Sequence, residues 1–325
     1  KPVAGTRLLA TVRSAADQAD TPAAPAKKLP AAQEPGRFHG FIGQSPGMQG
    51  VFRTIEQVAD SRAAVFVTGE SGTGKEVTAE ALHSASRRRD RAFVAINCGA
   101  IPENLLESEL FGHVKGAFTG AVENRIGAAK AADGGTLFLD EICEMELKLQ
   151  VKLLRFIQTG MIQRVGSARA EPVDVRIVCA TNRDPLREVA EGRFREDLYY
   201  RLNVVRLSLP ALEARREDIP LLAQHLLERI RREIGATARG ISDEAMARIR
   251  AYDWPGNVRE LENALTRAAI LARGPLIGPE HLTLGFQAPQ KPSQKGPGRV
   301  PEGDLTLDGA IKCQIRRVLE QTEGN

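Results

Sequence analysis

The chain has 325 residues, and its 45 Lys and Arg against 41 Asp and Glu give a formal net charge of +4. This length allows about two or three domains, and the small positive excess excludes a surface that is basic throughout, so any contact with DNA must be local. The longest apolar runs, residues 63–67 and 268–272, are five residues long, whereas a membrane-spanning helix needs about 18 to 20. The four cysteines form no CxxC pair, which predicts neither a zinc site nor a disulfide framework and favours the reducing cytoplasm.

Proline-rich segments flank the central part of the sequence. Residues 17–38 and 286–303 carry closely spaced prolines among small and charged residues. This composition predicts linkers rather than helices or central strands. The chain opens on Lys1 rather than Met, and its last residues follow a helical pattern without a closing element, so we expect it to be part of a longer protein.

Short apolar runs alternate with helical patterns over residues 39–208. A helical pattern at residues 48–59 precedes the apolar run 63–67, and further apolar runs follow at residues 93–96, 136–139 and 175–180. This alternation predicts an α/β fold, with a parallel sheet covered by helices on both faces. From residue 209 to residue 285 the strand signals stop, and the apolar spacing predicts a small all-helical subdomain.

The first predicted strand runs directly into a GxxxxGK sequence, which a helical pattern follows from Glu76. The sequence consists of Gly69, Glu70, Ser71, Gly72, Thr73, Gly74 and Lys75. Between a strand and a helix, the glycines turn backbone N–H groups inward and the lysine adds a full charge, which together bind phosphate. A glycine-rich surface turn with a solvated lysine is the alternative. Glu76 stands where Ser or Thr is usual, so a Mg²⁺ ion would depend on phosphates, water and a second carboxylate.

Two acidic residues follow the predicted strand at residues 136–139. Two acids at the carboxyl end of a buried strand are costly unless they have a partner or a function. Asp140 suits Mg²⁺, and Glu141 suits a base that polarises water. A strand end that emerges into solvent, with an acidic helix cap, is the alternative.

Two arginines, Arg195 and Arg201, lie in an acidic neighbourhood six positions apart. Hydrolysis of ATP builds charge on the γ-phosphoryl group, and an arginine from a neighbouring subunit can stabilise that charge. Ordinary ion pairs with Glu196 and Asp197 are the alternative.

A glycine-bounded hexapeptide lies between the two predicted nucleotide motifs. It consists of Gly116, Ala117, Phe118, Thr119, Gly120 and Ala121. The residues alone favour a plain turn with a buried Phe118. With this GAFTGA hexapeptide, however, residues 41–285 resemble the bacterial sigma-54-dependent transcription activators of the NtrC class, whose motor is an AAA+ ATPase. The resemblance implies that the loop contacts sigma-54 and that Phe118 and Thr119 are exposed and move with the nucleotide state.

The resemblance also assigns roles in the nucleotide site at matching positions. Residues 69–75 match the Walker A loop, for which Glu76 is the family's own next residue. Asp140 and Glu141 match the Walker B pair. Arg195 and Arg201 resemble the paired arginine fingers.

Sensor roles follow from the resemblance at four further positions. Asn97 resembles the asparagine that holds the catalytic glutamate inactive until the γ-phosphate is sensed. Thr181 and Asn182 match the first sensor, and Arg259 matches the second sensor, on the helical lid. The residues themselves leave other readings open, namely strand-end caps for the first three and an ion pair with Glu262 for Arg259.

The two ends of the chain also resemble parts of known domains. Residues 1–16 resemble the last helix of a phosphoacceptor receiver domain, and residues 304–325 resemble the first helix of a Fis-like DNA-binding domain that ends before its helix-turn-helix. The resemblance implies a response regulator that meets a sensor kinase and enhancer DNA through parts missing from this chain. Within the family, residues 141–145 and 153–160 are most similar to the LuxO-type quorum-sensing regulators.

The resulting hypothesis is an ATP-hydrolysing activator that binds ATP and Mg²⁺ and assembles into a ring, a hexamer. Through residues 116–121 it would remodel the closed complex of the sigma-54 RNA polymerase holoenzyme, in the cytoplasm and without membrane contact. One alternative is another AAA+ ring remodeller, an unfoldase or helicase, whose moving loop would need aromatic grip residues or basic DNA contacts. A non-hydrolysing nucleotide switch is the other, against which Glu141 and the two arginines argue.

Overall fold

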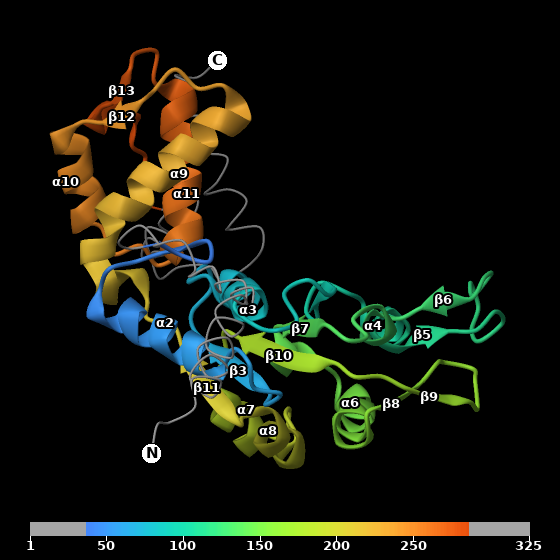
Figure 1. Cartoon of the computed structure of the whole chain (residues 1–325). Coiled ribbons are helices and arrows are strands. Elements are labelled where there is room, and N and C mark those ends of the chain that lie inside the picture. The colour runs from blue at the N-terminus through green and yellow to red at the C-terminus, as the bar shows by residue number, and fades with distance from the viewer. Residues whose placement is uncertain (1–36, 286–325) are drawn as a thin grey trace, which may run out of the picture. The chain divides into compact units, whose positions relative to one another are not determined.

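A computed structural model describes residues 37–285 of the chain (Figure 1). Its centre is a five-stranded sheet in the order β11-β3-β10-β7-β4, in which every neighbouring pair is parallel. The strands are β3 (Val65–Thr68), β4 (Phe93–Asn97), β7 (Thr136–Asp140), β10 (Arg176–Thr181) and β11 (Val205–Ser208). The predicted parallel sheet is confirmed. The sequence analysis missed β11, because this edge strand is partly exposed and has no continuous apolar run.

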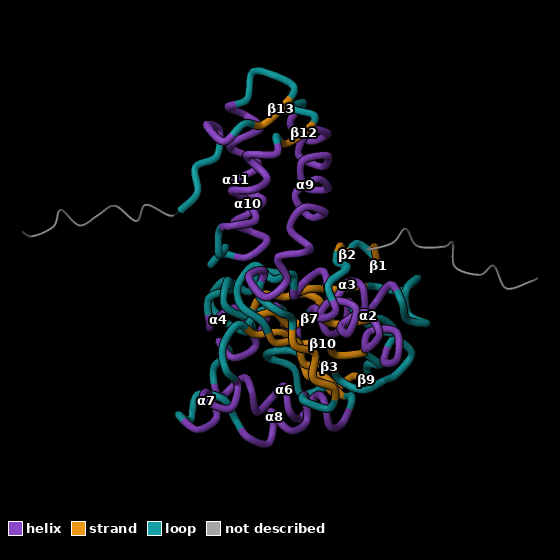
Figure 2. Tube along the Cα trace, turned by 90° about the vertical axis from the view of Figure 1, so that its left-hand side faces the viewer, coloured by secondary structure: helices purple, strands orange, loops and turns teal. Residues whose placement is uncertain are grey.

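Helices cover both faces of the sheet, as the sequence predicted (Figures 1 and 2). They are α2 (Pro46–Val58), α3 (Lys75–Ser84), α4 (Glu103–Phe111), α6 (Leu147–Thr159), α7 (Pro185–Ala190) and α8 (Glu196–Leu202). Successive strand residues face opposite sides of a sheet. Val65 and Val67 accordingly pack in the core layer that includes α2 and α3, whereas Phe66 packs in the layer that includes α4, α6 and α8. Because both layers are apolar, the central strands read as continuous apolar runs.

The strand register brings the functional segments to one edge of the sheet. Thr68 at the end of β3 pairs with Thr181 at the end of β10, and Asn97 at the end of β4 pairs with Asp140 at the end of β7. β7 and β10 are direct neighbours. Since parallel strands end at a common edge, the segments that follow these four strands start side by side.

Three separate hairpins and two short helices lie in the described chain before the lid. The hairpins are β1 (Arg37–Phe38) with β2 (Phe41–Ile42), β5 (Gly112–His113) with β6 (Arg125–Ile126), and β8 (Met161–Gln163) with β9 (Ala170–Pro172). The short helices are α5 (Ala128–Ala131) and η1 (Ile142–Glu144). The second and third hairpins touch, since the Val165 N–H donates to the Gly112 carbonyl at 2.9 Å and the Val114 N–H donates to the Val165 carbonyl at 3.0 Å (Figure 1).

A helical lid subdomain follows residue 209 (Figure 2). It contains η2 (Leu212–Asp218), α9 (Ile219–Ile234), α10 (Asp243–Ala251), α11 (Asn257–Leu271) and η3 (Pro279–His281). The expectation that strands stop after residue 209 is wrong at one place, because β12 (Gly240–Ile241) pairs in parallel with β13 (Leu276–Ile277). Strands of two residues are too short to produce a readable hydrophobic period.

Buried Asp218 ties the start of the lid to the start of α2. Its Oδ1 accepts from the backbone N–H groups of Gln44 at 2.7 Å and Ser45 at 2.8 Å, and its Oδ2 accepts from the Ser45 hydroxyl at 2.6 Å. The Asp218 side chain is fully buried. A buried carboxylate with charge-assisted hydrogen bonds fixes the relative position of the two segments.

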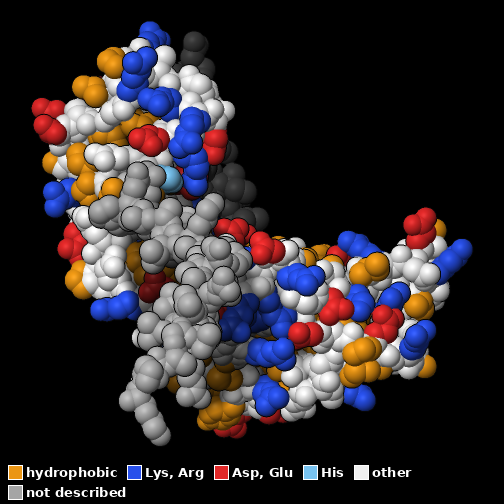
Figure 3. Space-filling model, viewed as in Figure 1, with side chains coloured by type: hydrophobic (Ala, Val, Ile, Leu, Met, Phe, Trp, Pro, Cys, Tyr) orange, Lys and Arg blue, Asp and Glu red, His pale blue; other side chains and the backbone are white. Residues whose placement is uncertain are grey.

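Several expectations fall at or beyond the limits of residues 37–285. The receiver remnant, the second linker and the Fis-like segment lie outside the described residues, and the first predicted linker overlaps β1 at residues 37–38. In the part of the chain that the structure describes, no helix is long and apolar enough to cross a membrane. On the face in Figure 3, basic and acidic side chains are interspersed, as the small net charge suggests.

Candidate functional site

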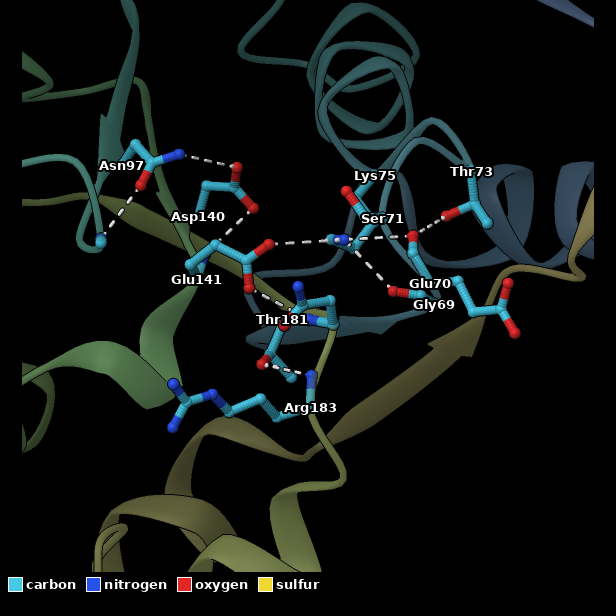
Figure 4. Close-up of polar contacts among 12 residues, drawn as sticks. Gly69, Glu70, Ser71, Thr73, Lys75, Asn97, Asp140, Glu141, Thr181 and Arg183 are labelled. Atoms are coloured by element: carbon cyan, nitrogen blue, oxygen red, sulfur yellow. Dashed lines mark hydrogen bonds and ion pairs between the residues drawn. The ribbon is translucent and has the colours of Figure 1, made fainter. Parts of the chain in front are cut away.

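The loop between β3 and α3 folds around the side chain of Lys75 (Figure 4). The Lys75 ammonium group donates to the carbonyl oxygens of Gly69 at 3.2 Å and Glu70 at 3.3 Å, and the residue is only 7% exposed. These contacts rule out the alternative of a surface turn with a solvated lysine. α3 begins at Lys75, one residue before the expected start, and its N-cap is Gly74, which has no side chain to cap the helix. The N-terminus of α3 is therefore suited to an anion.

Gly72 is required by both its conformation and its surroundings. Its φ is +78°, in the left-handed region that favours glycine. A Cβ atom at this position would lie 2.4 Å from the carbonyl oxygen of Gly256 in the lid. The glycine thus lets the lid approach the phosphate loop closely.

The two acids at the carboxyl end of β7, Asp140 and Glu141, face this loop (Figure 4). Glu141 has a φ of +50°, which is uncommon for a residue other than glycine. Its Oε1 lies 3.6 Å from the Lys75 ammonium nitrogen, and its Oε2 accepts from the backbone N–H of Asn182 at 3.1 Å. Burial, followed by the charge of Glu141, raises the pKa of the Asp140 carboxyl. Glu141 makes no side-chain cap of the following helix, so the alternative of an acidic helix cap does not apply.

Asn97 contacts the other acid of the pair. Its Nδ2 donates to Asp140 Oδ2 at 3.3 Å, and its Oδ1 accepts from the backbone N–H groups of Gly99 and Ala100, both at 3.0 Å. The cap of a strand-end turn, which was the alternative reading, is therefore formed. In this structure Asn97 touches Asp140 rather than Glu141.

The end of β10 completes the edge. Thr181 is fully buried, and its hydroxyl oxygen accepts from the backbone N–H of Arg183 at 3.1 Å. Asn182 is exposed and reaches Glu141 through its backbone, as described above. The Arg183 guanidinium binds Glu188 at 3.2 Å and also pairs with Glu144. The segment after β10 is thus anchored to the acidic turn after β7.

Arg259 of the lid lies against the phosphate loop. Its Nη1 donates to the Ser71 hydroxyl at 3.2 Å. The alternative ion pair of Arg259 with Glu262 is not formed, since Glu262 pairs with Arg229.

Two residues that the sequence analysis missed hold the lid to the same loop. Asn257 is fully buried with a φ of +51°, and its Nδ2 donates to Glu70 Oε2 at 3.0 Å and to the Ser71 carbonyl at 3.1 Å. Arg215 is 2% exposed and donates to the Thr73 carbonyl at 3.0 Å, while burial lowers its pKa. Its Nε has no hydrogen-bond partner among residues 37–285. The pair Gly256 and Asn257 at the start of α11 is a sequence signal that could have pointed to Asn257, whereas no local pattern singles out Arg215.

A cavity of about 350 Å³ lies between the phosphate loop and the lid. Its walls include the charged groups described above and the apolar side chains of Phe41, Ile42, Leu222 and Leu226. Charged groups that can bind phosphates therefore share one cavity with side chains that can cover an apolar ring.

Arg195 and Arg201 do not line this cavity. Arg195 directly precedes α8, and its guanidinium binds Asp197, with Nε–Oδ1 at 3.0 Å and Nη2–Oδ2 at 2.6 Å. The ion-pair alternative therefore holds for Arg195. Arg201 lies in the last turn of α8 and is exposed. The structure does not bring these two arginines to the site of their own chain.

The hexapeptide at residues 116–121 forms a tight loop beyond β5. The Gly116 N–H donates to the Ala121 carbonyl at 2.9 Å, which closes the loop at its base. Thr119 is exposed, as expected. Phe118 differs from both readings of the sequence, since it is half-buried and its ring packs edge-on against His113, with the ring centroids 5.0 Å apart.

Comparison with known proteins agrees with this architecture. The family model for the sigma-54 interaction domain matches residues 41–208, and the model for the AAA+ ATPase lid domain matches residues 213–298. The regulatory protein LuxO of Vibrio cholerae is 62% identical over 237 residues, which is 73% of this chain and 52% of that protein. The luminescence regulatory protein LuxO of Vibrio campbellii is 55% identical over 100% of this chain and 72% of its own length.

Solved structures are also similar. NtrX from Brucella abortus in complex with ADP superposes with a TM-score of 0.70 at 36% identity, over 87% of this chain and 61% of that one. The same protein in complex with ATP gives 0.70 at 34% identity, over 99% and 68%. The parallel sheet, the phosphate loop and the helical lid define an AAA+ P-loop domain. The chain belongs to the sigma-54-dependent transcriptional activators of the NtrC class, so the resemblance found in the sequence is confirmed. The matched part of this chain spans about half the length of Vibrio cholerae LuxO.

Proposed function

We propose that this chain is the ATP-hydrolysing motor of a sigma-54-dependent activator. The observation that carries the proposal is the contact of Glu141 with both Lys75 and the Asn182 backbone N–H at one edge of the sheet. The lid is hydrogen-bonded to the adjoining loop through Asn257 and Arg259. Buried lysine, oriented carboxylate and attached lid together suit hydrolysis of a nucleoside triphosphate.

ATP binds in the cavity between the loop and the lid. Its phosphates lie on residues 69–75 and at the N-terminus of α3, where Lys75 supplies a full positive charge and Glu76 lies in the first helical turn. Arg259, held against Ser71, adds a second positive charge from the lid. The base takes the apolar part of the cavity at Phe41, Ile42, Leu222 and Leu226.

Asp140 is the carboxylate that would hold Mg²⁺ beside the phosphates. The site fits a divalent cation for an electrostatic reason. Burial and the neighbouring charge of Glu141 raise the pKa of the Asp140 carboxyl, and a cation would relieve the repulsion between the two acids. When bound, Mg²⁺ neutralises charge on the phosphates. Asn97 orients Asp140 through its side-chain amide.

Glu141 acts as the general base. The oxygen of a water attacks the γ-phosphorus, the bond from that phosphorus to the β,γ-bridging oxygen breaks, and the water proton goes to the Glu141 carboxylate. The Asn182 N–H and the Lys75 ammonium hold this carboxylate in place. Asn182 acts in the first sensor through this link, and Thr181 beside it completes that sensor. Asn97 restrains Glu141 only if its amide moves from one carboxylate to the other when the nucleotide changes.

Arg195 and Arg201 act on the site of a neighbouring subunit. Both lie outside the cavity of their own chain, which is expected of arginines that complete a site in trans. This arrangement requires a closed ring with head-to-tail contacts, and we propose a hexamer. The Arg195 guanidinium must leave Asp197 when it enters the neighbour's site.

The loop at residues 116–121 contacts sigma-54 in the RNA polymerase holoenzyme. Thr119 is exposed for this contact, and Phe118 joins it when its ring leaves His113. Residues 39–208 and 209–285 form the ATPase and lid subdomains of a cytoplasmic two-component regulator. Its receiver answers a sensor kinase, and its C-terminal domain binds enhancer DNA.

Two substitutions test the base and the loop separately. Glu141→Gln should leave ATP binding intact but slow turnover by about 10²- to 10⁴-fold, because the general base is lost. Thr119→Ala should leave hydrolysis unchanged while abolishing transcription activation. Glu123→Gln, in an exposed segment, is the control for both. An unchanged rate in Glu141→Gln would remove its assigned role, and loss of both activities in Thr119→Ala would indicate a folding role for the loop.

A further inference from the structure

Gln150 in α6 is a fully buried polar residue that the proposed chemistry does not use. Its Nε2 donates to the carbonyl oxygens of Met145 at 2.7 Å and Arg193 at 2.9 Å, and its Oε1 accepts from the backbone N–H of Arg195 at 2.8 Å. Buried amides are hydrogen-bonded as a rule, and this one bonds three backbone groups of two separate segments. Its removal would leave those groups without their partner.

The two segments joined by this amide belong to different parts of the proposed mechanism. Met145 closes the short turn that follows Glu141, since its N–H donates to the Ile142 carbonyl at 3.2 Å. The other two partners flank Phe194, which is 1% exposed and anchored in the core. One side chain thus connects the turn after the proposed base to the segment that carries Arg195.

A second anchor holds the same segment from its other side. The Arg193 guanidinium binds Glu188 with two hydrogen bonds, Nε–Oε2 at 2.7 Å and Nη2–Oε1 at 2.8 Å. The Glu188 carbonyl also accepts from the N–H groups of Arg193 at 2.9 Å and Phe194 at 3.1 Å. Arg183, next to Asn182 in the proposed sensor, reaches the Glu188 carboxylate at 3.2 Å. The backbone before α8 is therefore fixed on two sides.

We propose that Gln150 is a positioning residue for the arginine finger. It fixes the backbone of Arg195 so that the guanidinium reaches the nucleotide site of the neighbouring subunit, and it links that position to the turn after Glu141 in its own subunit. Among the described residues, the Arg195 side chain binds only Asp197, which lies two positions further along the chain. The position of the guanidinium therefore depends on the backbone of Arg195. This inference rests on the proposed function, in which Arg195 acts in trans.

Gln150→Met tests the proposal, because methionine keeps the length and packing of the side chain but none of its hydrogen bonds. We expect kcat for ATP hydrolysis to fall by about 100-fold, the effect of a misplaced group remote from the binding contacts, while KM for ATP stays within about twofold of the wild type. Gln158→Met, at an exposed position on the same helix, is the matched control and should keep the wild-type rate.

Mixing Gln150→Met subunits with Glu141→Gln subunits distinguishes an effect on the arginine finger from an effect on the general base. A Glu141→Gln subunit has no base but presents an intact Arg195 segment, whereas a Gln150→Met subunit has an intact base. Random mixing at equal amounts joins the two intact halves at about one site in four, so the rate should rise to about a quarter of the wild-type rate. Arg195→Ala mixed with Glu141→Gln is the reference and should recover equally.

The outcomes are distinct. If Gln150→Met stays inactive in the mixture while Arg195→Ala recovers, Gln150 acts inside its own site and the proposal is overturned. A wild-type rate of Gln150→Met alone overturns it as well. If Arg195→Ala does not recover, the trans role of Arg195 fails, and the proposal falls with that part of the proposed function. Should Gln150→Met lack a cooperative melting transition, Gln150→Glu, which keeps the acceptor for the Arg195 N–H, takes its place in the same mixtures.

Discussion

The carboxyl edge of the sheet and the segments beyond it differ in the groups that they contact. At the edge, Glu141 contacts both the Lys75 ammonium group and the Asn182 backbone N–H within one chain. Arg195 and the loop at residues 116–121 lie outside the cavity, and the side chains of Arg195 and Phe118 contact Asp197 and His113, which are close to them in the sequence. In the proposed function, the edge binds nucleotide within one chain, whereas the other two features act only against a second molecule.

Arg195→Ala tests this contrast most severely. If the arginine completes a neighbour's site, its loss should slow ATP hydrolysis by about 10³- to 10⁵-fold, while ATP binding stays unchanged. Steady-state ATPase assays and titration with a fluorescent ATP analogue measure the two effects. Arg187→Ala is the control, since Arg187 is exposed and forms a similar pair with Glu191. A rate within about twofold of wild type would reduce Arg195 to the partner of Asp197.

Gly72→Ala tests how closely the lid approaches the edge. The left-handed backbone should cost about 1 to 2 kcal/mol, and the clash with the Gly256 carbonyl should cost about 1 to 3 kcal/mol more. We expect a lower melting temperature and weaker ATP binding. Gly235→Ala is the matched control, because Gly235 has a φ of +66° and nothing within 4 Å of the added Cβ. Equal losses in the two variants would mean that the lid contact does not constrain the loop.

Asn257→Ala tests the hydrogen bonds between the lid and the loop. The Glu70 carboxylate and the Ser71 carbonyl would lose their amide donor, and the Leu212 N–H would lose its acceptor at 2.7 Å. We expect destabilisation by about 1 to 3 kcal/mol, measured by urea unfolding. Asn104→Ala, at an exposed position on α4, should change little. An unchanged free energy of unfolding in Asn257→Ala would show that the lid is held by other contacts.

Glu188 gives the smallest effect, in the dependence of stability on pH. Hydrogen bonds from Arg193 hold the pKa of this carboxyl at about 2, below the value of 4.5 for an exposed glutamate. A lowered pKa stabilises the fold above the unfolded-state value, and the contribution is lost as pH falls through the folded-state value. The melting temperature of the wild type should therefore exceed that of Glu188→Gln at pH 6, and the difference should shrink from pH 4.5 toward pH 2. A constant difference would contradict this assignment.

The sequence predicted the edge well because its signals are local. Short apolar runs end one or two positions before the phosphate loop, Asp140 and Asn182, and strands of a parallel sheet end together. The glycines and Lys75 of the loop then identify the phosphate site. The same reasoning could not place β11, which is half-exposed, or the pair β12 and β13, which have two residues each.

Residues that act over long sequence separations escaped the sequence analysis. Arg215 meets Thr73 across 142 positions, and Gln150 meets Arg193 across 43 positions, so no local pattern indicates either contact. Phe118 was misjudged for a related reason, because its exposure depends on His113 and on how the loop folds back. Such roles depend on packing, which the order of the residues does not display.

Binding to sigma-54 in the presence of ADP and aluminium fluoride, a mimic of the hydrolysis transition state, tests the central claim most directly. The account predicts a complex that forms with the mimic, does not form without nucleotide, and is lost in Phe118→Ala while ATPase activity remains. Val122→Ala, at an exposed position just after the loop, should keep the complex. No complex from an active ATPase would contradict the account and leave an AAA+ motor with a different target.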